Sequence, residues 1–488
     1  MAPEGTQAEI ATADTEVRPV LVVDLDGTVL RSDMLVESFW SALAQDWRSP
    51  FLATPALIQG RAALKARLAD AARIDPATLP YNTAVLEHVR AWRAQGGRTA
   101  LVTAAHGALA ECVAAHLGLF DEVHGSDGHL NLKGSRKAAF LAERFGTEGY
   151  SYLGDAPADL PVWQGAAHAI TFTPSMRLRR AVEALGGRTE HLPAPAPRVA
   201  DYVRALRPHQ WLKNLLVFVP VMTSHQIDAI ILSAAFLAFV SFSLIASAVY
   251  VLNDLLDLAA DRAHPRKHAR PFASGAVSLL HGSFMVPALL LAGFLVALML
   301  GSAFALVMLG YLVLTTAYSL DLKRRLVIDI CVLAGLYTLR ILAGSVATGI
   351  ELSVWLLAFS IFFFLSLAAV KRQAELVDLR SVGGSQVQGR GYQVADLEFV
   401  VPMALAAGYA SVLVMALYIN SPEVRELYAS PYALWGICPV LLYWISRIVM
   451  VTHRGHMHDD PVIFAIRDPI SRITLVLVLG FALAGTLL

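Results

Sequence analysis

About nine apolar segments of membrane-crossing length follow one another beyond residue 203. The hydrocarbon core of a bilayer is about 30 Å thick, so an α-helix needs roughly 20 apolar residues to cross it. Because lipid offers no hydrogen-bond partners, such segments can fold only as a bundle of membrane-spanning helices. With 56% hydrophobic and 16% charged residues over 488 positions, the chain is too apolar for an ordinary soluble protein. The segments lie at about 211–224, 228–252, 278–300, 302–319, 327–348, 351–370, 398–420, 431–451 and 470–488.

Basic residues are distributed unequally between the loops that connect these segments. With a cytoplasmic N-terminus, the inner loops carry clusters of Lys and Arg, whereas the outer loops carry only Arg425. Membrane proteins keep such residues on the cytoplasmic side, so nine spans with the C-terminus outside is the simplest topology. The first segment is short and the 302–319 segment is borderline, so the count can differ by one. We expect an integral protein of a bacterial inner (plasma) membrane, with its N-terminal part in the cytoplasm.

Residues 19–192 have a different pattern, typical of a soluble α/β domain. Short apolar runs at 20–23 and 99–102 alternate with amphipathic helical stretches. Residues 1–18 lack the apolar core of a secretory signal and are expected to form a disordered tail. Alternating Pro and Ala predict a stiff linker at 193–202, before a transmembrane domain at 203–488. The predicted fold class is therefore multidomain: a Rossmann-like α/β domain followed by an all-α polytopic membrane bundle.

Charge and cysteine content argue against two other classes of protein. The formal net charge is +0, which disfavours a nucleic-acid binder. Cys112, Cys331 and Cys438 lie far apart, so neither a disulfide framework nor a zinc site is indicated.

An acidic stripe ends the second apolar segment. Asn253, Asp257 and Asp261 are spaced four apart and Asp254 precedes Asp257 by three, so a continuous helix would direct all four similarly. Three carboxylates at a membrane boundary need a compensating cation, and Mg²⁺ prefers such oxygen ligands. The basic run that follows suits a phosphate-rich substrate; the alternative is a solvated flank beside a membrane span. This run contains Arg262, Arg266, Lys267 and Arg270.

Four motifs follow one another in the N-terminal domain. Asp24-Leu25-Asp26-Gly27-Thr28 comes directly after an apolar run, and Thr103 ends the next predicted strand. Lys137 follows, and then Gly154-Asp155-Ala156-Pro157-Ala158-Asp159 comes after a third strand-like run. Motifs of this kind in this order resemble the haloacid dehalogenase superfamily of phosphatases.

This resemblance implies a role for each motif residue. Asp24 attacks phosphorus, Asp26 exchanges a proton with the leaving group, and Thr103 and Lys137 hold the phosphoryl oxygens. Lys133 competes with Lys137 for the lysine role. Residues 31–80 would form a mostly helical cap that selects substrate, and the alternative is a non-catalytic domain kept as an anchor. The implied Mg²⁺ ligands are Asp24, Asp26, Asp155 and Asp159.

The acidic stripe resembles the first aspartate-rich motif of the UbiA family of intramembrane prenyltransferases, and nine helices fit that fold. The resemblance implies that Asn253, Asp254, Asp257 and Asp261 hold Mg²⁺. A second acidic motif should then end the fourth segment, near Tyr318 and Lys323. Asp321, Asp329 or both are candidates there.

Three separate stretches, 207–214, 264–271 and 459–468, resemble the decaprenyl-phosphate phosphoribosyltransferase branch of that family. The resemblance implies transfer of 5-phosphoribosyl from phosphoribosyl diphosphate to a polyprenyl phosphate. These substrates carry several phosphates and need many cations. An arginine midway along an apolar segment, Arg340, should face a polar cavity or a carboxylate. The candidate substrate-binding residues of this part are Lys213, Asn214, Arg262, Lys267, Arg270, Tyr318, Lys323, Arg340, Lys371 and Arg467.

Together, the motifs predict a bifunctional membrane enzyme. The transferase product would still carry a 5-phosphate, which a phosphatase tethered beside it would remove to leave polyprenylphosphoryl ribose, a lipid-linked pentose donor for the cell envelope. The alternative within the family is a prenyltransferase using polyprenyl diphosphate and an aromatic acceptor, with a phosphatase of unrelated substrate. A transporter is disfavoured because the acids cluster at a helix end. Both active sites are expected in the cytoplasm, no nucleic-acid partner is expected, and a homo-oligomer is left open.

Overall fold

The computed structural model describes residues 19–127, 131–224, 228–385, 390–422, 424, 428–457 and 460–487. The expected tail, Arg425 and Asp459 lie outside these residues. The chain divides into two compact units, which are described separately. The first consists of residues 1–205 and 254–284, and the second of residues 206–253 and 285–488.

The first unit is built on a six-stranded parallel sheet with the order β3-β2-β1-β4-β5-β6. The first strand in sequence is therefore central, and the strand order reverses beside it. Open sheets of this kind bind ligands at the carboxyl ends of the strands near such a reversal. The strands are β1 (Val20–Val23), β2 (Thr99–His106), β3 (Glu122–Ser126), β4 (Tyr150–Gly154), β5 (His168–Phe172) and β6 (Arg188–Leu192).

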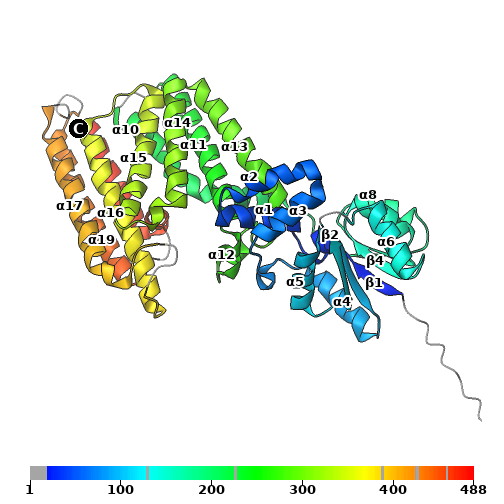
Figure 1. Ribbon diagram of the computed structural model, residues 1–488. Helices are drawn as coiled ribbons and strands as arrows, with labels where there is room; N and C mark the ends of the chain where they lie inside the picture. Colours follow the sequence, from blue (N-terminus) through cyan, green and yellow to red (C-terminus); the bar gives the residue numbers. More distant parts are fainter. Residues whose placement is uncertain are drawn as a thin grey trace, which may run out of the picture. The chain divides into compact units, whose positions relative to one another are not determined.

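Helices cover both faces of this sheet (Figure 1). Alternate residues of the central strands point to opposite faces, so Leu21 and Val23 enter one apolar core while Val22 enters the other. The first core is closed by α4 (Thr83–Ala94) and α5 (Gly107–Leu117). The second is closed by α6 (Ser135–Phe145), α7 (Leu160–Gln164) and α8 (Met176–Glu183).

Residues 31–80 are mostly helical, as predicted for a cap. This part contains α1 (Met34–Gln45), α2 (Ser49–Ala53) and α3 (Arg61–Ala71), joined by short 3₁₀ turns at Thr54–Gln59 and Pro76–Thr78. Segment 254–284 belongs to the same unit. It contains α12 (Leu258–Ala263) and a 3₁₀ turn at Lys267–Ala269, and it ends within the first turns of α13 (Leu279–Met299).

The second unit is a bundle of long apolar helices. Within the part of the chain that the structure describes, eight helices are long and apolar enough to cross a membrane. Two of these spans begin with a 3₁₀ turn, at Val394–Asp396 and Pro431–Gly436. A short helix, α20 (Pro461–Arg467), precedes the last span. The long helices are α11 (Ala229–Leu256), α13, α14 (Ser302–Leu320), α15 (Ile328–Thr348), α16 (Val354–Ser381), α17 (Leu397–Ile419), α19 (Ile437–His453) and α21 (Pro469–Leu487).

The first expected span, 211–224, differs from the prediction. Residues Pro208–Phe218 form a 3₁₀ helix, and only Val219–Ser224 continue as α-helix, α10. A proline has no backbone N–H to donate within an α-helix, and Pro220 stands at the change between the two helix types. The 3₁₀ backbone also approaches α15 closely, since a Cβ on Gly344 would lie 2.0 Å from the carbonyl oxygen of Val217.

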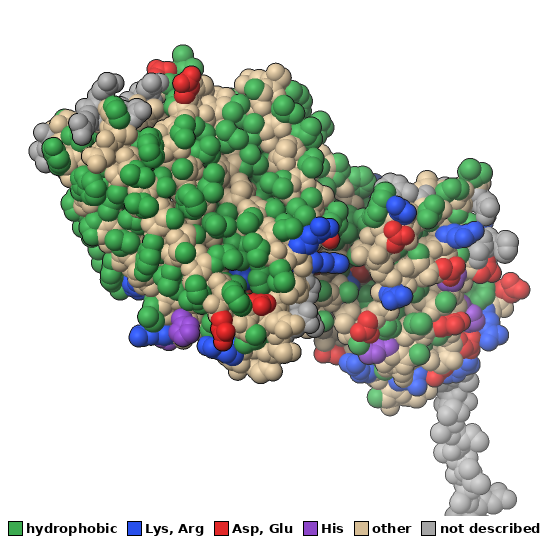
Figure 2. All heavy atoms as spheres, turned by 60° about the vertical axis from the view of Figure 1, so that its left-hand side comes forward, with side chains coloured by type: hydrophobic (Ala, Val, Ile, Leu, Met, Phe, Trp, Pro, Cys, Tyr) green, Lys and Arg blue, Asp and Glu red, His purple; other side chains and the backbone are tan. Residues whose placement is uncertain are grey.

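The surface of the helical bundle is suited to lipid. Hydrophobic side chains cover most of its visible face, and most charged side chains on that face gather toward one end (Figure 2). Large apolar residues such as Leu291, Leu306 and Phe399 are more than half exposed. Water would disfavour so large an apolar surface, so the chain is an integral membrane protein.

Candidate functional sites

The first candidate site lies at the carboxyl edge of the parallel sheet. Asp24 follows β1 and Asp155 follows β4, which are neighbouring strands. One carboxylate oxygen from each of Asp24, Asp155 and Asp159 lies within 4.8 Å of the others. Thr28 donates a hydrogen bond to Asp155 (3.2 Å), and a Cβ on Gly27 (φ +76°) would lie 2.2 Å from an Asp155 oxygen. Glycine at this turn therefore lets the backbone lie against the carboxylate cluster.

Lys137 supplies the positive charge of this site. Its Nζ lies 3.0 Å from Asp24 Oδ1 and 3.7 Å from Asp159 Oδ1, and the residue is 1% exposed. Burial lowers the pKa of Lys137, but Asp24 and Asp159 outweigh it and hold the pKa above its ordinary value. Lys133 also lines the cavity, but it is Lys137 that contacts Asp24, so the geometry favours Lys137 for the lysine role.

The acidic groups of the site are crowded. Burial, with Asp24 and Asp159 adding to it, raises the pKa of Asp155 to about 8. Burial and Asp24 raise the pKa of Asp159 to about 6 against the opposing effect of Lys137. Carboxylates that repel one another in this way favour a bound cation. The donor set is made of hard oxygens and therefore fits Mg²⁺.

Asp26 is placed to carry a proton. Its Oδ1 accepts a hydrogen bond from the backbone N–H of Met34 (2.8 Å), at the start of the cap helix α1. Burial, followed by repulsion from Asp33 and Asp24, raises the pKa of Asp26 well above its ordinary value. A raised pKa favours the protonated form, which is the form that a general acid needs before it acts.

Thr103 is placed differently from the expectation. Strand β2 continues past it to His106, with a shift in the pairing register against β3 between Val102 and His106. Thr103 is fully buried, and its hydroxyl accepts a hydrogen bond from the N–H of Ala105 (3.0 Å). The cavity wall beside it is made by residues 104–106. Any contact of this strand end with a phosphate would therefore come from those residues rather than from the Thr103 side chain.

The cavity above these groups measures about 500 Å³ and contains two cationic residues that sequence reasoning missed. Lys65, from the cap helix α3, donates to the carbonyl of Ala104 (2.5 Å) and to Asn131 (3.3 Å). Arg31 lies at the start of the cap and donates to Asn82 (3.2 Å). Neither residue belongs to a motif, so only the folded cap reveals that both line the cavity.

The acidic stripe at 253–261 is not one continuous helix. The helix α11 ends at Leu256 and α12 begins at Leu258, so the chain breaks at Asp257 (φ −94°, ψ 12°). Asp257 is exposed, whereas Asp254 and Asp261 are buried. The expectation that one continuous helix aligns all four residues is therefore wrong.

A cation already lies between two of these carboxylates. Arg270 NH1 is 3.2 Å from Asp254 Oδ1 and 2.5 Å from Asp261 Oδ2. Asn253 donates instead to Ser319 Oγ (3.1 Å). Arg270 thus occupies a position between two oxygen ligands where a metal ion would also be stable. The donor set of carboxylate and amide oxygens fits Mg²⁺.

The basic residues after the stripe do not form one surface. Arg262 makes a two-pronged ion pair with Glu37 of the cap, at 2.6 and 3.0 Å. Lys267 lies exposed in the short 3₁₀ turn that follows. Of the three residues expected to bind phosphate here, Arg262 therefore pairs with an acid of the first unit, and Arg270 neutralises the aspartates.

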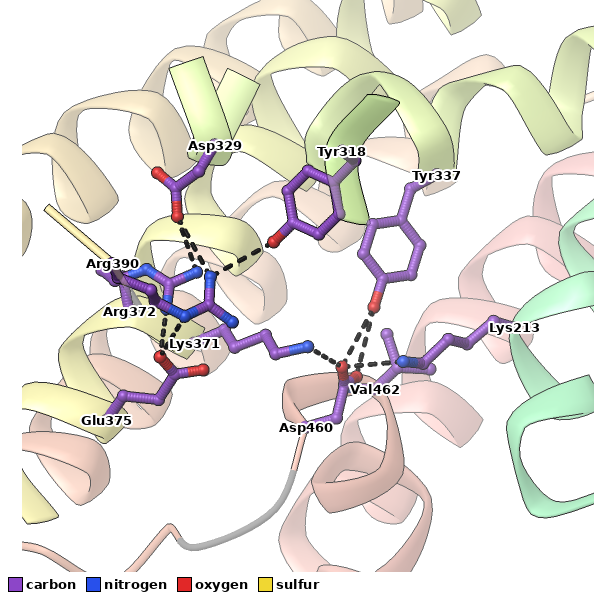
Figure 3. A network of polar contacts seen from close by, with 10 residues as sticks. All are labelled: Lys213, Tyr318, Asp329, Tyr337, Lys371, Arg372, Glu375, Arg390, Asp460 and Val462. Carbon is purple, nitrogen blue, oxygen red and sulfur yellow. Dashed lines mark hydrogen bonds and ion pairs between the residues drawn. The ribbon is translucent and has the colours of Figure 1, made fainter. Parts of the chain in front are cut away.

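A cluster around Asp460 forms a third candidate site, within the helical bundle (Figure 3). Asp460 Oδ2 lies 2.8 Å from Lys213 Nζ and 3.1 Å from Lys371 Nζ, and Asp460 Oδ1 accepts from the Tyr337 hydroxyl (3.2 Å). Asp460 also caps α20 by accepting from the N–H of Val462 (3.2 Å). Burial alone would raise the pKa of Asp460, but Lys371 and Lys213 outweigh it and hold the pKa below its ordinary value. One carboxylate therefore serves two ammonium groups, and the cluster keeps a net positive charge.

Among the described residues, the contacts of Arg340 are with an amide, a backbone carbonyl and aromatic rings rather than with a carboxylate. Its Nε donates to Asn214 Oδ1 (3.0 Å), and Asn214 in turn donates to Ser243 (3.0 Å). The guanidinium also lies 5.0–5.6 Å from the ring centroids of three aromatic residues, which attract a cation electrostatically. The expected polar partner is therefore an amide. The three aromatic residues are Phe242, Tyr311 and Tyr337.

The two candidates for the second acidic motif, Asp321 and Asp329, have different environments. Asp321 is exposed and pairs with Arg325 (2.7 Å), as a loop acid would. Asp329 is fully buried and pairs with Arg372 (2.7 Å) and Arg390 (3.4 Å), as Figure 3 shows. Its other oxygen accepts from the hydroxyl of Tyr392 (2.7 Å).

The remaining predicted residues lie around this buried acid or at helix ends. Tyr318 accepts from Arg390 (3.3 Å) and so joins the Asp329 cluster. Lys323 is half-buried in the turn Leu322–Arg324. Arg467 is exposed at the last residue of α20. The sequence analysis did not identify Asp460, Arg390 or Glu375 as site residues. Asp460 could have been suggested by its position in the stretch 459–468.

Comparison with known proteins agrees with the two-part architecture. Residues 215–456 match the model of the UbiA prenyltransferase family, and residues 21–164 match that of haloacid dehalogenase-like hydrolases. A Sinorhizobium fredii protein, uncharacterized protein y4nM, is 39% identical over 455 residues, which cover 92% of this chain and 88% of that protein. Decaprenyl-phosphate phosphoribosyltransferase of Mycobacterium tuberculosis is 43% identical over 285 residues, 57% of this chain and 92% of that protein. A solved UbiA homolog from Archaeoglobus fulgidus, bound to GPP and Mg²⁺, is 18% identical with a TM-score of 0.45 over 58% of this chain and 99% of that one.

Proposed function

Because this chain belongs to the UbiA prenyltransferase family and carries a haloacid dehalogenase-like hydrolase domain, we propose that it makes a lipid-linked ribose in two steps. In the first, the helical bundle transfers 5-phosphoribosyl from phosphoribosyl diphosphate to a polyprenyl phosphate. In the second, the phosphatase domain removes the 5-phosphate to leave polyprenylphosphoryl ribose. Both sites face the cytoplasm of a bacterium, at its inner membrane.

The observation that carries the transferase step is the excess of cations buried in the bundle. Lys213 and Lys371 share the single carboxylate of Asp460, and Arg340 has an amide partner instead of an acid. Such groups bind anions strongly because little water screens them. The donor brings a diphosphate and a 5-phosphate and the acceptor another phosphate, whereas an aromatic acceptor would need fewer cations. The name of the mycobacterial relative points to the same substrates.

The transfer itself needs little proton chemistry. The C1–oxygen bond to the diphosphate breaks, the diphosphate leaves with the electron pair, and an anionic oxygen of the lipid phosphate forms the new bond to C1. Bound Mg²⁺ would supply positive charge to the departing diphosphate, and Asn253, Asp254, Asp257 and Asp261 are the residues proposed to hold it. Lys213 and Lys371 would orient the phosphates, and an apolar groove would stabilise the prenyl chain by about 0.8 kcal/mol per buried methylene.

The phosphatase step uses the sheet-edge residues. Asp24 attacks phosphorus, and the ribose 5-oxygen leaves with a proton from Asp26, whose pKa is raised by burial and by the neighbouring Asp33 and Asp24. Lys137 reduces the repulsion between the Asp24 carboxylate and the phosphate. Water then hydrolyses the aspartyl phosphate, with Asp26 now accepting a proton. Asp155 and Asp159, with Asp24, are the residues proposed to hold Mg²⁺.

Mass spectrometry of the lipid products tests the proposal. Purified protein with phosphoribosyl diphosphate, Mg²⁺ and a polyprenyl phosphate should yield polyprenylphosphoryl ribose, and the Asp24→Asn variant should accumulate the 5-phosphorylated lipid. Wild-type protein that leaves the 5-phosphate in place would contradict the sequential scheme. Transfer to an aromatic acid from polyprenyl diphosphate, with no use of phosphoribosyl diphosphate, would establish the alternative activity instead.

A further inference from the structure

Segment 254–284 is packed into the phosphatase unit by contacts from several parts of the cap region. Arg262 and Glu37 form a two-pronged ion pair whose side chains are 6% and 4% exposed. Trp40 of α1 donates to Ser283 Oγ (3.0 Å), and α12 lies beside α1 (Figure 1). A buried two-pronged pair of this kind is costly to separate, because either charge alone would remain without water or a partner.

A glycine of this segment lies against the cap region. Gly275 has φ +70°, and a Cβ there would lie 2.6 Å from Arg31 Cβ and 3.3 Å from Pro80 Cβ. Arg31 itself lines the phosphatase cavity. The segment is therefore seated directly on a wall of that cavity, in a backbone conformation that only glycine adopts without strain.

Two residues of the segment reach the cavity. Ser278 and Leu280 line it together with the nucleophile Asp24 and with Lys137. Leu280 is 48% exposed and belongs to the first turn of α13, a helix able to cross a membrane. The cavity is therefore lined by charged residues and by Leu280, an apolar residue in the first turn of α13.

Three cationic residues line the cavity besides Lys137. They are Arg31, Lys65 and Lys133, and the lining also contains the carboxylates of Asp24, Asp26, Asp33, Asp155 and Asp159, three of which could hold a metal ion. At about 500 Å³ it has the size of a site for a whole small molecule. A second anionic group on the substrate, beyond the phosphate held at Asp24, would match these cations.

We propose that segment 254–284 completes the phosphatase cavity and makes the phosphatase selective for a phosphomonoester carried on a membrane lipid with a second phosphate near its head. This inference rests on the proposed function and adds the residues that select the substrate. Arg31, Lys65 and Lys133 bind the phosphodiester group, and Leu280 contacts the first isoprene units. A soluble phosphomonoester such as ribose 5-phosphate lacks both features and is hydrolysed less efficiently.

Displacing the segment at its contact with Arg31 tests this selectivity. Gly275→Ala introduces a Cβ that collides with Arg31. Gly349→Ala is the matched control, since Gly349 has φ +71° and a Cβ there would meet no atom within 4 Å. The full-length protein is assayed with synthetic polyprenylphosphoryl 5-phosphoribose in detergent micelles and with ribose 5-phosphate. We expect the ratio of kcat/KM for the lipid to kcat/KM for ribose 5-phosphate to fall at least tenfold in Gly275→Ala and to stay unchanged in Gly349→Ala.

A second variant tests the same role of the segment in case Gly275→Ala misfolds. Glu37→Gln keeps the shape of the side chain but removes the charge that pairs with Arg262, and it should lower the same ratio. If the wild type hydrolyses the lipid and neither Gly275→Ala nor Glu37→Gln changes the ratio, the role of the segment is wrong although the proposed function stands. If the wild type hydrolyses only ribose 5-phosphate, the proposed phosphatase substrate is wrong and the inference falls with it.

Discussion

Mg²⁺ affinity at the phosphatase site should depend steeply on pH. Without metal, the pKa of Asp155 is about 8 and that of Asp159 about 6, so protons compete with the cation. Between pH 6 and pH 8 the ionised fraction of Asp155 rises from about 1% to about half, and that of Asp159 doubles to nearly complete. The apparent affinity should therefore rise roughly 100-fold, equivalent to about 2.7 kcal/mol.

The same groups affect the stability of the metal-free protein. Their pKa values are higher in the folded state than the ordinary value of 3.8. The folded state therefore holds extra protons, and stability falls as the pH rises from about 4 to about 8. Mg²⁺ should reverse this loss, so the shift in Tm that it produces should be larger at pH 8 than at pH 6.

Calorimetric titration of the full-length protein with Mg²⁺ at pH 6, 7 and 8 measures the effect. The Asp155→Asn variant is the control, because it removes the group that titrates near pH 8. In that variant the affinity should change only about twofold over the same range, through Asp159. A wild-type affinity that changes less than threefold between pH 6 and pH 8 would refute the argument from carboxylate crowding.

Two predictions concern the membrane unit and the acidic segment. Asp257→Ala should abolish phosphoribosyl transfer while the protein still folds, because Asp257 is exposed; full activity with radiolabelled phosphoribosyl diphosphate would reject its role as a metal ligand. Asp329→Ala should destabilise the protein by about 3–5 kcal/mol, because the fully buried Arg372 loses one of its two carboxylate partners and keeps only the partly exposed Glu375. Unfolding in detergent should show this loss, and Asp321→Ala, which removes an exposed ion pair, should cost about 1 kcal/mol or less. Equal stabilities for the two variants would contradict this account of Asp329.

Much of the architecture could be predicted from local pattern. The run at 20–23 forms β1, the cap at 31–80 is mostly helical, and eight long apolar segments form helices of membrane length among the described residues. These features depend on residues close together in the chain, through hydropathy and periodicity. The order of the N-terminal motifs likewise predicted the family of that domain.

Pairings between distant residues could not be predicted in the same way. Spacing alone suggested that the acidic stripe is one helix, but the chain breaks at Asp257 and Arg270 lies between Asp254 and Asp261. Arg262 was expected to bind phosphate, and it pairs instead with Glu37, far away in the sequence.

The sequence by itself determined most of the helices, strands and membrane spans, and all of the chemical groups that the chain carries. Only the tertiary structure decided which charges meet: Asp460 with Lys213 and Lys371, and Asp329 with Arg372. The physical reason is that a buried charge must find an opposite charge or a polar group wherever packing brings one close. That choice depends on the whole fold rather than on neighbouring residues.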